Sequence, residues 1–376
     1  MSDTSTWIEL SRNALIHNLN ILRSRTIGQR LVVPIKGNAY GHGMLEMASM
    51  LVDQGVDCLA VTTVDEACEL RDNGIVVDIF MLSSALPSEY DLVVALGVTI
   101  VAHDLDLAHG VSDSAVRSGK TVDVHVEIDT GMGRQGHVKD SLGEFMRELD
   151  ELPGIRVTGL MTHFATSDEL DSDGRRYFSD QLGSFRKLAG ELKTLYPSIV
   201  ELHCGNSGAI LSNDLADMTM ARPGIAVYGL WPSESVARAS ELELMPVLSW
   251  KTRVVQVKDL EADSFISYGC TYRTTRNTKI AILPVGYYDG LFRSLSNAGR
   301  VLVNGTSVPI LGRVCMNHTV VDVTDIDVKV GAEVVLIGVQ GEERITAEDH
   351  ARWEGTINYE CVTKLARHIQ RTVINR

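Results

Sequence analysis

Eight short apolar runs, separated by helix-like stretches, constrain what the first two thirds of this chain can fold into. Most of the runs are nearly continuous in apolar residues, which is typical of strands buried on both faces of a parallel sheet. They occupy residues 31–35, 58–62, 78–82, 98–102, 122–128, 157–162, 201–204 and 225–230. Helix-like stretches lie between them, for instance at residues 45–54, 64–73, 105–118 and 141–152. Eight strands joined by helical crossovers predict an α/β fold, a (β/α)8 barrel of the TIM type.

The sequence changes character after residue 230. Residues 232–235 indicate a linker, and β-rich runs follow at 248–257, 279–285, 300–303, 308–311, 319–323 and 333–339. Asn304-Gly305 lies between two of these runs and predicts a hairpin, because both residues tolerate positive φ. A last helix is expected at residues 361–373. We therefore expect a barrel domain over residues 1–235, its first ten or so residues packing with the C-terminal part, and a mostly β domain over residues 236–376.

Composition narrows the class of protein. The net charge of -14 argues against a nucleic-acid partner, since phosphate binding needs clustered Lys and Arg. The six cysteines form no C-x-x-C pair, so no metal site is predicted. The N-terminus lacks the basic and apolar regions of a signal peptide, and no apolar run approaches the ~20 residues of a membrane helix. We expect a cytoplasmic metabolic protein that binds neither nucleic acid nor membrane.

The most informative segment is VVPIKGNAYGHG, residues 32–43. It places Lys36 at the C-terminal end of the first barrel strand, where catalytic groups of this fold collect. Partial desolvation there favours the neutral, nucleophilic amine that a Schiff base requires. A lone lysine at a strand end would more readily be interpreted as extending to solvent. The Gly, Asn, Tyr and His residues around Lys36 favour the catalytic interpretation.

Two glycine-containing segments follow the late strands, LHCGNSG at residues 202–208 and ARPGI at residues 221–225. Loops at this position of a barrel often bind phosphate through backbone N–H groups. Ser207 and the amides near Gly224 are therefore candidates for holding a cofactor phosphate. Taken alone, each segment would more readily be interpreted as a turn that caps a helix.

A third segment, ISYGCTY at residues 266–272, lies in the β-rich part. A tyrosine hydroxyl ordinarily ionises at about pH 10, so it acts as an acid–base group only beside positive charge or a proton acceptor. His163 or an arginine could supply that neighbour. From composition alone, Tyr268 would be interpreted as an ordinary strand aromatic.

A rival hypothesis comes from GMGRQG, residues 131–136, which fits the G-x-G-x-x-G pattern of dinucleotide-binding dehydrogenases. That fingerprint should open a helix within the first βαβ unit. Here it follows several strands, and the next helix is expected to begin near Asp140. We therefore rank an NAD-dependent dehydrogenase well below the lysine-centred interpretation.

The three segments, in this order, resemble alanine racemase, a family with an N-terminal barrel and a C-terminal β domain. The resemblance extends from Leu31 to at least Tyr359, and the Lys-x-Asn-Ala-Tyr-Gly-His-Gly motif is highly specific. It implies an isomerase that interconverts L-alanine and D-alanine by two-base proton transfer on a pyridoxal 5'-phosphate aldimine. It also implies a homodimer with active sites shared between subunits, and a role in D-alanine biosynthesis.

The resemblance further implies roles for individual residues. Lys36 would hold the cofactor and act as base on one face of the substrate, and Tyr268 of the other subunit would act on the opposite face. Residues at the cofactor phosphate would be Tyr40, Asn206, Ser207, Gly224, Ile225 and Tyr359. His163 would sit against the cofactor ring, and Arg222 would face the pyridine nitrogen. Arg134 and the backbone of Met316 would contact the substrate, and its access channel would be lined by Asp168, Tyr287, Arg293 and Arg313.

Several alternatives share parts of this pattern. A racemase of serine or another amino acid on the same scaffold is the nearest, and the tyrosine at position 359 favours the small side chain of alanine. A related decarboxylase or transaminase is disfavoured by Arg222, because an arginine keeps its protons and cannot protonate the pyridine nitrogen. A non-catalytic pyridoxal-phosphate-binding protein would resemble only the barrel and would not need Tyr268.

Two positions depart from the family pattern. Many members have a lysine, often carbamylated, where this chain has Glu127, and aspartate is usual where it has Asn317. A glutamate could supply a permanent negative charge to Arg134 without the modification. Asn317 bears on rate and substrate choice rather than on the type of reaction.

Overall fold

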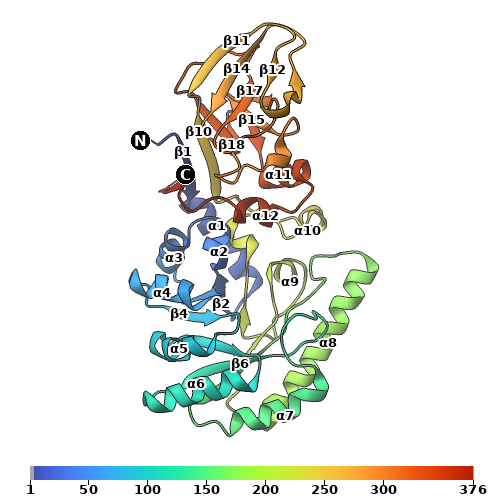
Figure 1. The fold of residues 1–376 in the computed structure, drawn as a ribbon. Coiled ribbons are helices and arrows are strands. Elements are labelled where there is room, and N and C mark those ends of the chain that lie inside the picture. The colour runs from blue at the N-terminus through green and yellow to red at the C-terminus, as the bar shows by residue number, and fades with distance from the viewer. Residues whose placement is uncertain (1–3, 376) are drawn as a thin grey trace. The chain divides into compact units, whose positions relative to one another are not determined.

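The computed structural model describes residues 4–375, which form two compact units. The barrel unit comprises residues 16–36 and 47–244. The β-rich unit comprises residues 4–15, 37–46 and 245–375. Figure 1 shows the course of the chain through both units, and each is described by itself below. None of the helices within residues 4–375 is both long and apolar enough to span a bilayer.

The barrel unit contains eight parallel strands that neighbour one another in chain order. They are β2 (Arg30–Pro34), β3 (Cys58–Val61), β4 (Asp78–Met81), β5 (Thr99–Ala102), β6 (Val122–Glu127), β7 (Ile155–Met161), β8 (Glu201–His203) and β9 (Met220–Ala221). β9 pairs with β2, and a parallel bridge from Gly205 to Ala221 joins the end of β8 to β9 and closes the barrel. The predicted (β/α)8 fold is thus confirmed.

Helices connect the strands and surround them (Figure 1). They are α1 (Arg12–Arg25), which leads into the barrel, α3 (Met44–Asp53), α4 (Val64–Asp72), α5 (Tyr90–Leu96), α6 (Leu105–Arg117), α7 (Lys139–Asp150), α8 (Ser172–Leu195), α9 (Ser207–Ser212) and α10 (Glu234–Ala239). Side chains cap the N-termini of several of these helices. The Thr63 side chain accepts a hydrogen bond from the amide of Glu66 at the start of α4, and the Asp104 side chain accepts one from the amide of Leu107 at the start of α6. A cluster of buried apolar residues from several strands lies in the barrel, among them Val32, Phe80 and Met161.

Two predictions in the barrel region are wrong. The run at residues 225–230 is not the eighth strand: it contains the 3-10 helix η2 (Ile225–Tyr228), which Gly229 ends with φ 77°. The eighth strand is the two-residue β9, too short to leave a periodic pattern. The expected linker at residues 232–235 includes the start of α10, where the Ser233 hydroxyl caps the amide of Val236.

The β-rich unit is built on two sheets. The larger has the order β16 (Thr306–Pro309), β15 (Arg300–Val303), β18 (Glu333–Gln340), β10 (Leu248–Arg253), β1 (Thr6–Ser11) and β20 (Gln370–Ile374), with β19 (Glu343–Ile345) paired to β18. The smaller contains β11 (Gln256–Leu260), β14 (Thr278–Leu283) and β17 (Thr319–Asp322). A further pair is formed by β12 (Phe265–Ile266) and β13 (Tyr272–Arg273). The prediction of a mostly β C-terminal region is confirmed.

Two local predictions in this unit have opposite outcomes. Asn304 and Gly305 join β15 to β16 with φ of 49° and 74°, so the predicted hairpin is confirmed. The predicted helix at residues 361–373 is wrong: α12 (Asn358–Thr363) ends early and the chain continues as β20, parallel to β1. The preceding helix α11 (Ala347–Glu354) begins with a capping box formed by Thr346 and Asp349.

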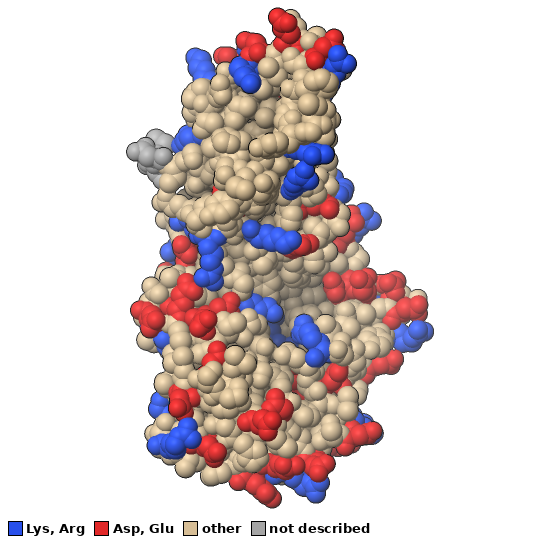
Figure 2. Space-filling model, in the orientation of Figure 1, with Lys and Arg blue, Asp and Glu red and all other residues tan. Residues whose placement is uncertain are grey.

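Charged side chains of both signs lie on the face of the protein that is drawn in Figure 2. Figure 2 shows acidic and basic groups interspersed on the face in view, with acidic groups the more numerous. This agrees with the net charge of -14.

Candidate active site

Lys36 follows β2 directly and begins an unusual turn. Residues 37–40 all have φ between 52° and 62°, which makes one left-handed turn from Gly37 to Tyr40. Only the first of them is glycine, and non-glycine residues in this region cost roughly 1–2 kcal/mol each. The Asn38 side chain offsets part of this cost by accepting a hydrogen bond from the amide of Met44 at 3.0 Å. Strain of this kind concentrates at functional sites.

The Lys36 amine is half-buried in a positive environment. Burial lowers its pKa most, and the charges of Arg134 and Arg222 lower it further, while Glu66 acts in the opposite sense. A lowered pKa increases the fraction of neutral amine, the form that attacks a carbonyl or accepts a proton.

Asn206 and Ser207 begin α9 and organise the turn that follows β9. The Ser207 hydroxyl accepts hydrogen bonds from the amides of Gly224 at 2.9 Å and Ala226 at 3.2 Å. Asn206 Oδ1 caps α9 through the amide of Ala209 at 3.0 Å. The two glycine-containing segments of the sequence are therefore brought together, and Ile225 lies between the two amides that Ser207 holds.

Arg222 is buried and holds the ends of two strands together. Its Nη1 lies 2.6 Å from His203 Nδ1 and donates to the His203 carbonyl at 3.0 Å. Its Nη2 donates to the Thr162 carbonyl at 2.8 Å and lies 3.4 Å from His163 Nδ1. Within residues 4–375 its Nε–H has no hydrogen-bond partner.

His163 lies beside Arg222 and is uncharged near neutral pH. Burial lowers the pKa of His163 to about 3, assisted by the positive charges of Arg222, Arg134 and Lys36. Its ring can accept or donate a hydrogen bond without adding charge to the site.

Arg134 and Glu127 lie in the same electrostatic environment without a direct ion pair. Glu127 ends β6 and is buried, whereas Arg134 is exposed. Burial raises the pKa of Glu127, and the charges of Arg222 and Arg134 oppose that rise. Within the described part of the chain, no ion pair within 4 Å joins the two side chains.

The segment at residues 131–136 is a loop and not the start of a helix. Asp129 Oδ1 accepts hydrogen bonds from the amides of Gly131 at 2.9 Å and Gly133 at 3.1 Å. The next helix, α7, begins only at Lys139. The dinucleotide-binding interpretation is therefore rejected, because its phosphate site requires the third glycine to open a helix.

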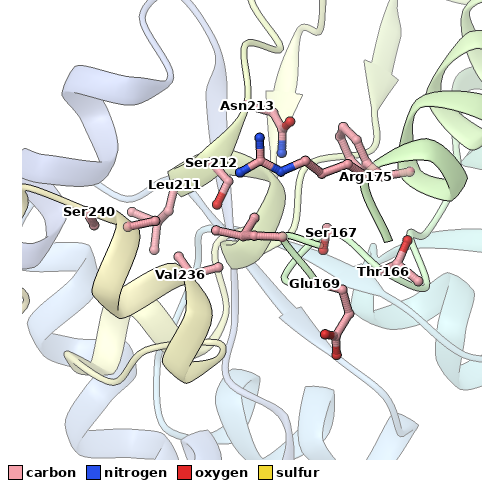
Figure 3. A pocket seen from close by; sticks show the side chains of 12 residues that line it. Thr166, Ser167, Glu169, Arg175, Leu211, Ser212, Asn213, Val236 and Ser240 are labelled. Carbon is pink, nitrogen blue, oxygen red and sulfur yellow. The ribbon is translucent and has the colours of Figure 1, made fainter. Parts of the chain in front are cut away.

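Asp168 lies in the loop after β7, and two serines hold its carbonyl. Ser233 and Ser235 donate to it at 2.7 and 2.8 Å. Next to this loop is a cavity of about 270 Å³ between α8, α9 and α10, which Figure 3 shows with Arg175 and Glu169 at its edge. None of the residues that line it is a predicted site residue, but Ser167 in its lining donates to Asn206 Oδ1 at 2.8 Å, so the cavity adjoins the predicted phosphate site.

The predicted residues between positions 268 and 316 lie in the β-rich unit, and all of them are exposed except Arg313, which is half-buried. Tyr268 is 71% exposed and follows Ser267, whose hydroxyl donates to the Arg313 carbonyl at 2.6 Å. The amide of Tyr287 donates to the Cys315 carbonyl at 3.0 Å, next to Met316. Arg293 belongs to the 3-10 helix η4 (Arg293–Leu295). The hydroxyl of Ser296, the residue after this helix, accepts a hydrogen bond from the amide of Val314. Met316 and Asn317 are both exposed.

Tyr40 and Tyr359 lie together within the β-rich unit. Their ring centroids are 6.3 Å apart with an interplanar angle of 52°. Burial raises the pKa of Tyr40 to about 12, so its hydroxyl stays protonated and acts as a hydrogen-bond donor.

Two buried histidines near Arg222 are not among the predicted site residues. His203 lies beside Arg222 and belongs to the segment at residues 202–208, and His125 of β6 contacts His203. A histidine between valines of a buried strand is a signal, because a buried polar ring requires partners.

Both parts of the chain match known protein families. Residues 10–232 match the family described as alanine racemase, N-terminal domain, and residues 247–373 match alanine racemase, C-terminal domain. Alanine racemase 2 of Caldanaerobacter subterraneus subsp. tengcongensis is 42% identical over 375 residues, which cover 99% of this chain and 95% of that protein.

Solved structures agree with these matches. The alanine racemase of Clostridium difficile 630 superposes with a TM-score of 0.92 at 34% identity, over 100% of this chain and 97% of that one. The histidine racemase of Leuconostoc mesenteroides subsp. sake has a TM-score of 0.88 at 28% identity, over 100% of this chain and 99% of that one.

Proposed function

The chain belongs to the alanine racemase family, whose members are pyridoxal-phosphate-dependent isomerases, and we propose that Lys36 and Tyr268 are its two bases. The reaction is the interconversion of L-alanine and D-alanine. The observation that carries the proposal is the half-buried Lys36 amine, whose pKa is lowered at the C-terminal end of a barrel strand.

The residues present fit pyridoxal phosphate. Lys36 supplies a nucleophilic amine, and the turn that Ser207 organises through the amides of Gly224 and Ala226 places the Ile225 amide between them as the proposed backbone donor to a phosphate. Arg222 has an unused Nε–H, suited to a ring nitrogen that accepts a hydrogen bond. Asn206, Ile225, Tyr40 and Tyr359 complete the proposed phosphate site, and His163 the proposed ring site. When bound, the cofactor supplies an electron sink for the charge left on the α-carbon.

Racemisation requires proton removal on one face of a planar carbon and return on the other, so one base is insufficient. The neutral Lys36 amine accepts or returns the proton on one face. The Tyr268 hydroxyl does so on the other. We propose that Tyr268 acts in the site of a second copy of the chain, which its 71% exposure and its place in the β-rich unit support.

Arg222 holds its protons at all working pH values and cannot transfer one to a pyridine nitrogen. It therefore limits how much charge the cofactor withdraws, which disfavours transamination and decarboxylation. Two residues are proposed to orient the substrate: Arg134, which would lie near it, and Met316, whose backbone would contact its carboxylate. Residues proposed to line the access channel are Asp168, Tyr287, Arg293 and Arg313.

Alanine is proposed as the substrate because Tyr359 would exclude longer side chains. The second candidate is racemisation of another amino acid, which a histidine racemase on a similar scaffold supports. Asn317 and Glu127 are the positions where this chain could differ in substrate breadth. A cytoplasmic homodimer that provides D-alanine for biosynthesis completes the proposal.

The purified protein tests this function directly. A pyridoxal-phosphate enzyme should absorb at about 420 nm, and chiral analysis after incubation with L-alanine, L-serine and L-lysine should show D-alanine forming fastest. Lys36→Ala should lose both the colour and the product. A colourless protein that stays inactive after cofactor is added would contradict the proposal, and preference for another amino acid would support the second candidate.

A further inference from the structure

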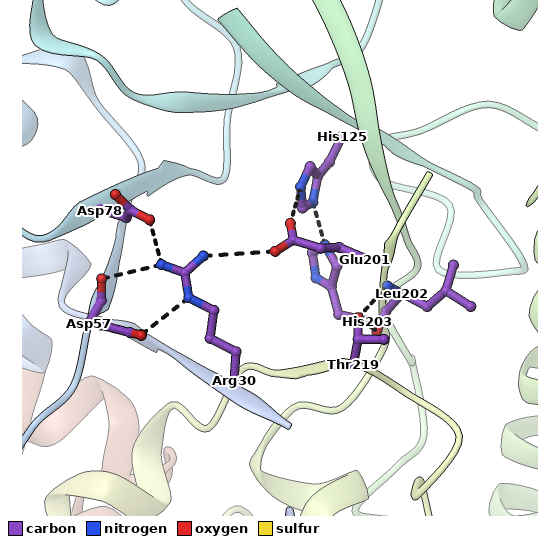
Figure 4. Close-up of polar contacts among 8 residues, drawn as sticks. All are labelled: Arg30, Asp57, Asp78, His125, Glu201, Leu202, His203 and Thr219. Carbon is purple, nitrogen blue, oxygen red and sulfur yellow. Dashed lines mark hydrogen bonds and ion pairs between the residues drawn. The ribbon is translucent and has the colours of Figure 1, made fainter. Parts of the chain in front are cut away.

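A line of polar side chains runs from Arg222 through the interior of the barrel. Arg222 Nη1 lies 2.6 Å from His203 Nδ1, and His203 Nε2 lies 2.7 Å from His125 Nδ1. His125 Nε2 lies 2.8 Å from Glu201 Oε2. We call these four residues the axial line, and Figure 4 shows all of it except Arg222.

The axial line ends at the rim of the barrel opposite Lys36. Glu201 begins β8, and its side chain is 27% exposed. Arg30, the first residue of β2, lies 3.8 Å from Glu201 and bonds to Asp57 and Asp78 near the starts of β3 and β4 (Figure 4). Strand starts lie at one end of a parallel barrel and strand ends at the other. The axial line therefore connects the N-terminal rim to the candidate site.

The two ends of the axial line favour the same direction of donors and acceptors. An arginine only donates, so the contact with Arg222 favours the His203 tautomer in which Nδ1 accepts and Nε2 carries the proton. His203 Nε2–H then donates to His125 Nδ1, which leaves the proton of His125 on Nε2. That proton faces a carboxylate, which only accepts. The last contact is close but poorly aligned, so it is an electrostatic pair rather than a directional hydrogen bond.

The charges of the groups agree with this arrangement. Burial, and then the positive charge of Arg222, hold the pKa of His203 well below its ordinary value, so the ring is neutral. Burial alone would raise the pKa of Glu201, but His125 and Arg30 outweigh it and lower the pKa, so the carboxylate is charged. The line thus has a fixed positive group at one end and a fixed negative group at the other.

The barrel interior is shaped around the two imidazoles. Gly159 leaves room for one ring, because a Cβ there would lie 2.5 Å from His125 Cε1. Phe80 packs on both rings, with centroids 4.9 Å from His125 and 5.4 Å from His203. Their neighbours in the interior are apolar, and an apolar pair could fill the same space without needing partners.

We propose that Glu201 is a positioning residue for Arg222: through His125 and His203 it stabilises, together with Arg222 itself, the tautomer that accepts from the guanidinium, and so helps to aim the free Arg222 Nε–H at the cofactor ring. The inference rests on the proposed function, since it takes Arg222 to face the cofactor. Glu201 itself touches neither substrate nor cofactor.

The tautomers of the two rings test the line directly, without cofactor. In apoprotein labelled with ¹⁵N-histidine, both rings should show a protonated Nε2 and a bare Nδ1 by NMR. The two signals are assigned from their loss in His125→Asn and His203→Asn. In Glu201→Leu the His125 N–H loses its acceptor and only the Arg222 contact still favours this direction, so both rings should populate a mixture of tautomers. Glu201→Gln keeps an acceptor oxygen and should restore the wild-type pattern, and Asp57→Asn is the matched rim control.

A second readout is the dissociation constant of pyridoxal phosphate. It should rise about tenfold in Glu201→Leu, the equivalent of one hydrogen bond to a charged group, and less than about twofold in Glu201→Gln and Asp57→Asn. A protonated Nδ1 on His203 in the wild type would overturn the proposal, even if no variant folds. The proposal would also be overturned if the tautomers changed in Glu201→Leu while the dissociation constant of pyridoxal phosphate stayed the same. Unchanged cofactor affinity in Arg222→Lys would instead contradict the proposed role of Arg222 itself.

Discussion

Gly41 approaches the carbonyl group of Val362 so closely that a Cβ on Gly41 would overlap it. Arg371 donates to the carbonyl of Gly41 at 2.8 Å and secures the same contact. Residues 37–46 are thereby held within the β-rich unit by α12 and the residues after it.

Replacing Gly41 by alanine should therefore destabilise the protein strongly. Strain at φ +81° costs roughly 1–2 kcal/mol, and overlap with the main chain of Val362 adds roughly 1–3 kcal/mol. Gly28→Ala is the matched control, because its φ is +79° and nothing lies within 4 Å of the added Cβ. In urea unfolding, the free energy of unfolding of Gly28→Ala should fall only by the cost of the positive φ, whereas that of Gly41→Ala should fall by both costs. Equal losses in the two variants would contradict the close contact.

Cofactor attachment to the apoprotein should depend on pH through Lys36. The neutral amine is the nucleophile, so the attachment rate rises with pH until the amine is fully deprotonated. Because the pKa of Lys36 is lowered by burial and by Arg134, this rise should occur below the pH expected of a free lysine. Arg134→Met should move it to higher pH, and Arg134→Lys, which keeps the charge, should not. The measurement is the rate of colour formation between pH 6 and about 10.

Glu127→Gln should weaken substrate binding if the carboxylate supports Arg134. Burial raises the pKa of Glu127, so as pH falls the charge is lost at a higher pH than for an ordinary glutamate. The wild-type KM should accordingly rise as the pH is lowered, and the KM of Glu127→Gln should be about tenfold higher and lose that dependence. Asp123→Asn, on the same strand but paired with Arg156 at the surface, is the control. Unchanged KM and kcat in Glu127→Gln would reject the idea.

A shared site predicts that two inactive variants repair each other. Lys36→Ala and Tyr268→Phe homodimers should each be inactive, but a mixed dimer has one site with both bases intact. Random exchange of subunits makes half of the dimers mixed, so the mixture should recover about a quarter of wild-type activity. No recovery, despite mixed dimers seen by native mass spectrometry, would show that Tyr268 acts in its own chain.

The strands and helices of the barrel were predictable from sequence because each is a local pattern. Continuous apolar runs such as 31–35 bounded by turns indicate a buried strand wherever they occur. The eighth strand was not predictable, since β9 has two residues and is defined by pairing with β2, about 190 positions away. The apolar run at residues 225–230 misled because burial alone does not distinguish a strand from a 3-10 helix.

The C-terminal end shows the same limit. Residues 370–374 form a strand because they pair with β1, and nothing local distinguishes that segment from the end of a helix. In the site, motif residues such as Lys36 and Ser207 were identifiable by their neighbours in sequence. The axial line was not, because His125, Glu201 and Arg222 come together only when the barrel closes.

The most direct test of the two-base account follows the α-proton of each alanine enantiomer in deuterated solvent by ¹H NMR. In Tyr268→Phe, Lys36 remains, so one enantiomer should still exchange its α-proton while conversion to the other falls at least a hundredfold. As the control, replacement of another exposed tyrosine of the β-rich unit, Tyr288→Phe, should behave as the wild type. Racemisation at the wild-type rate in Tyr268→Phe would contradict the account, as would equal loss of exchange in both enantiomers.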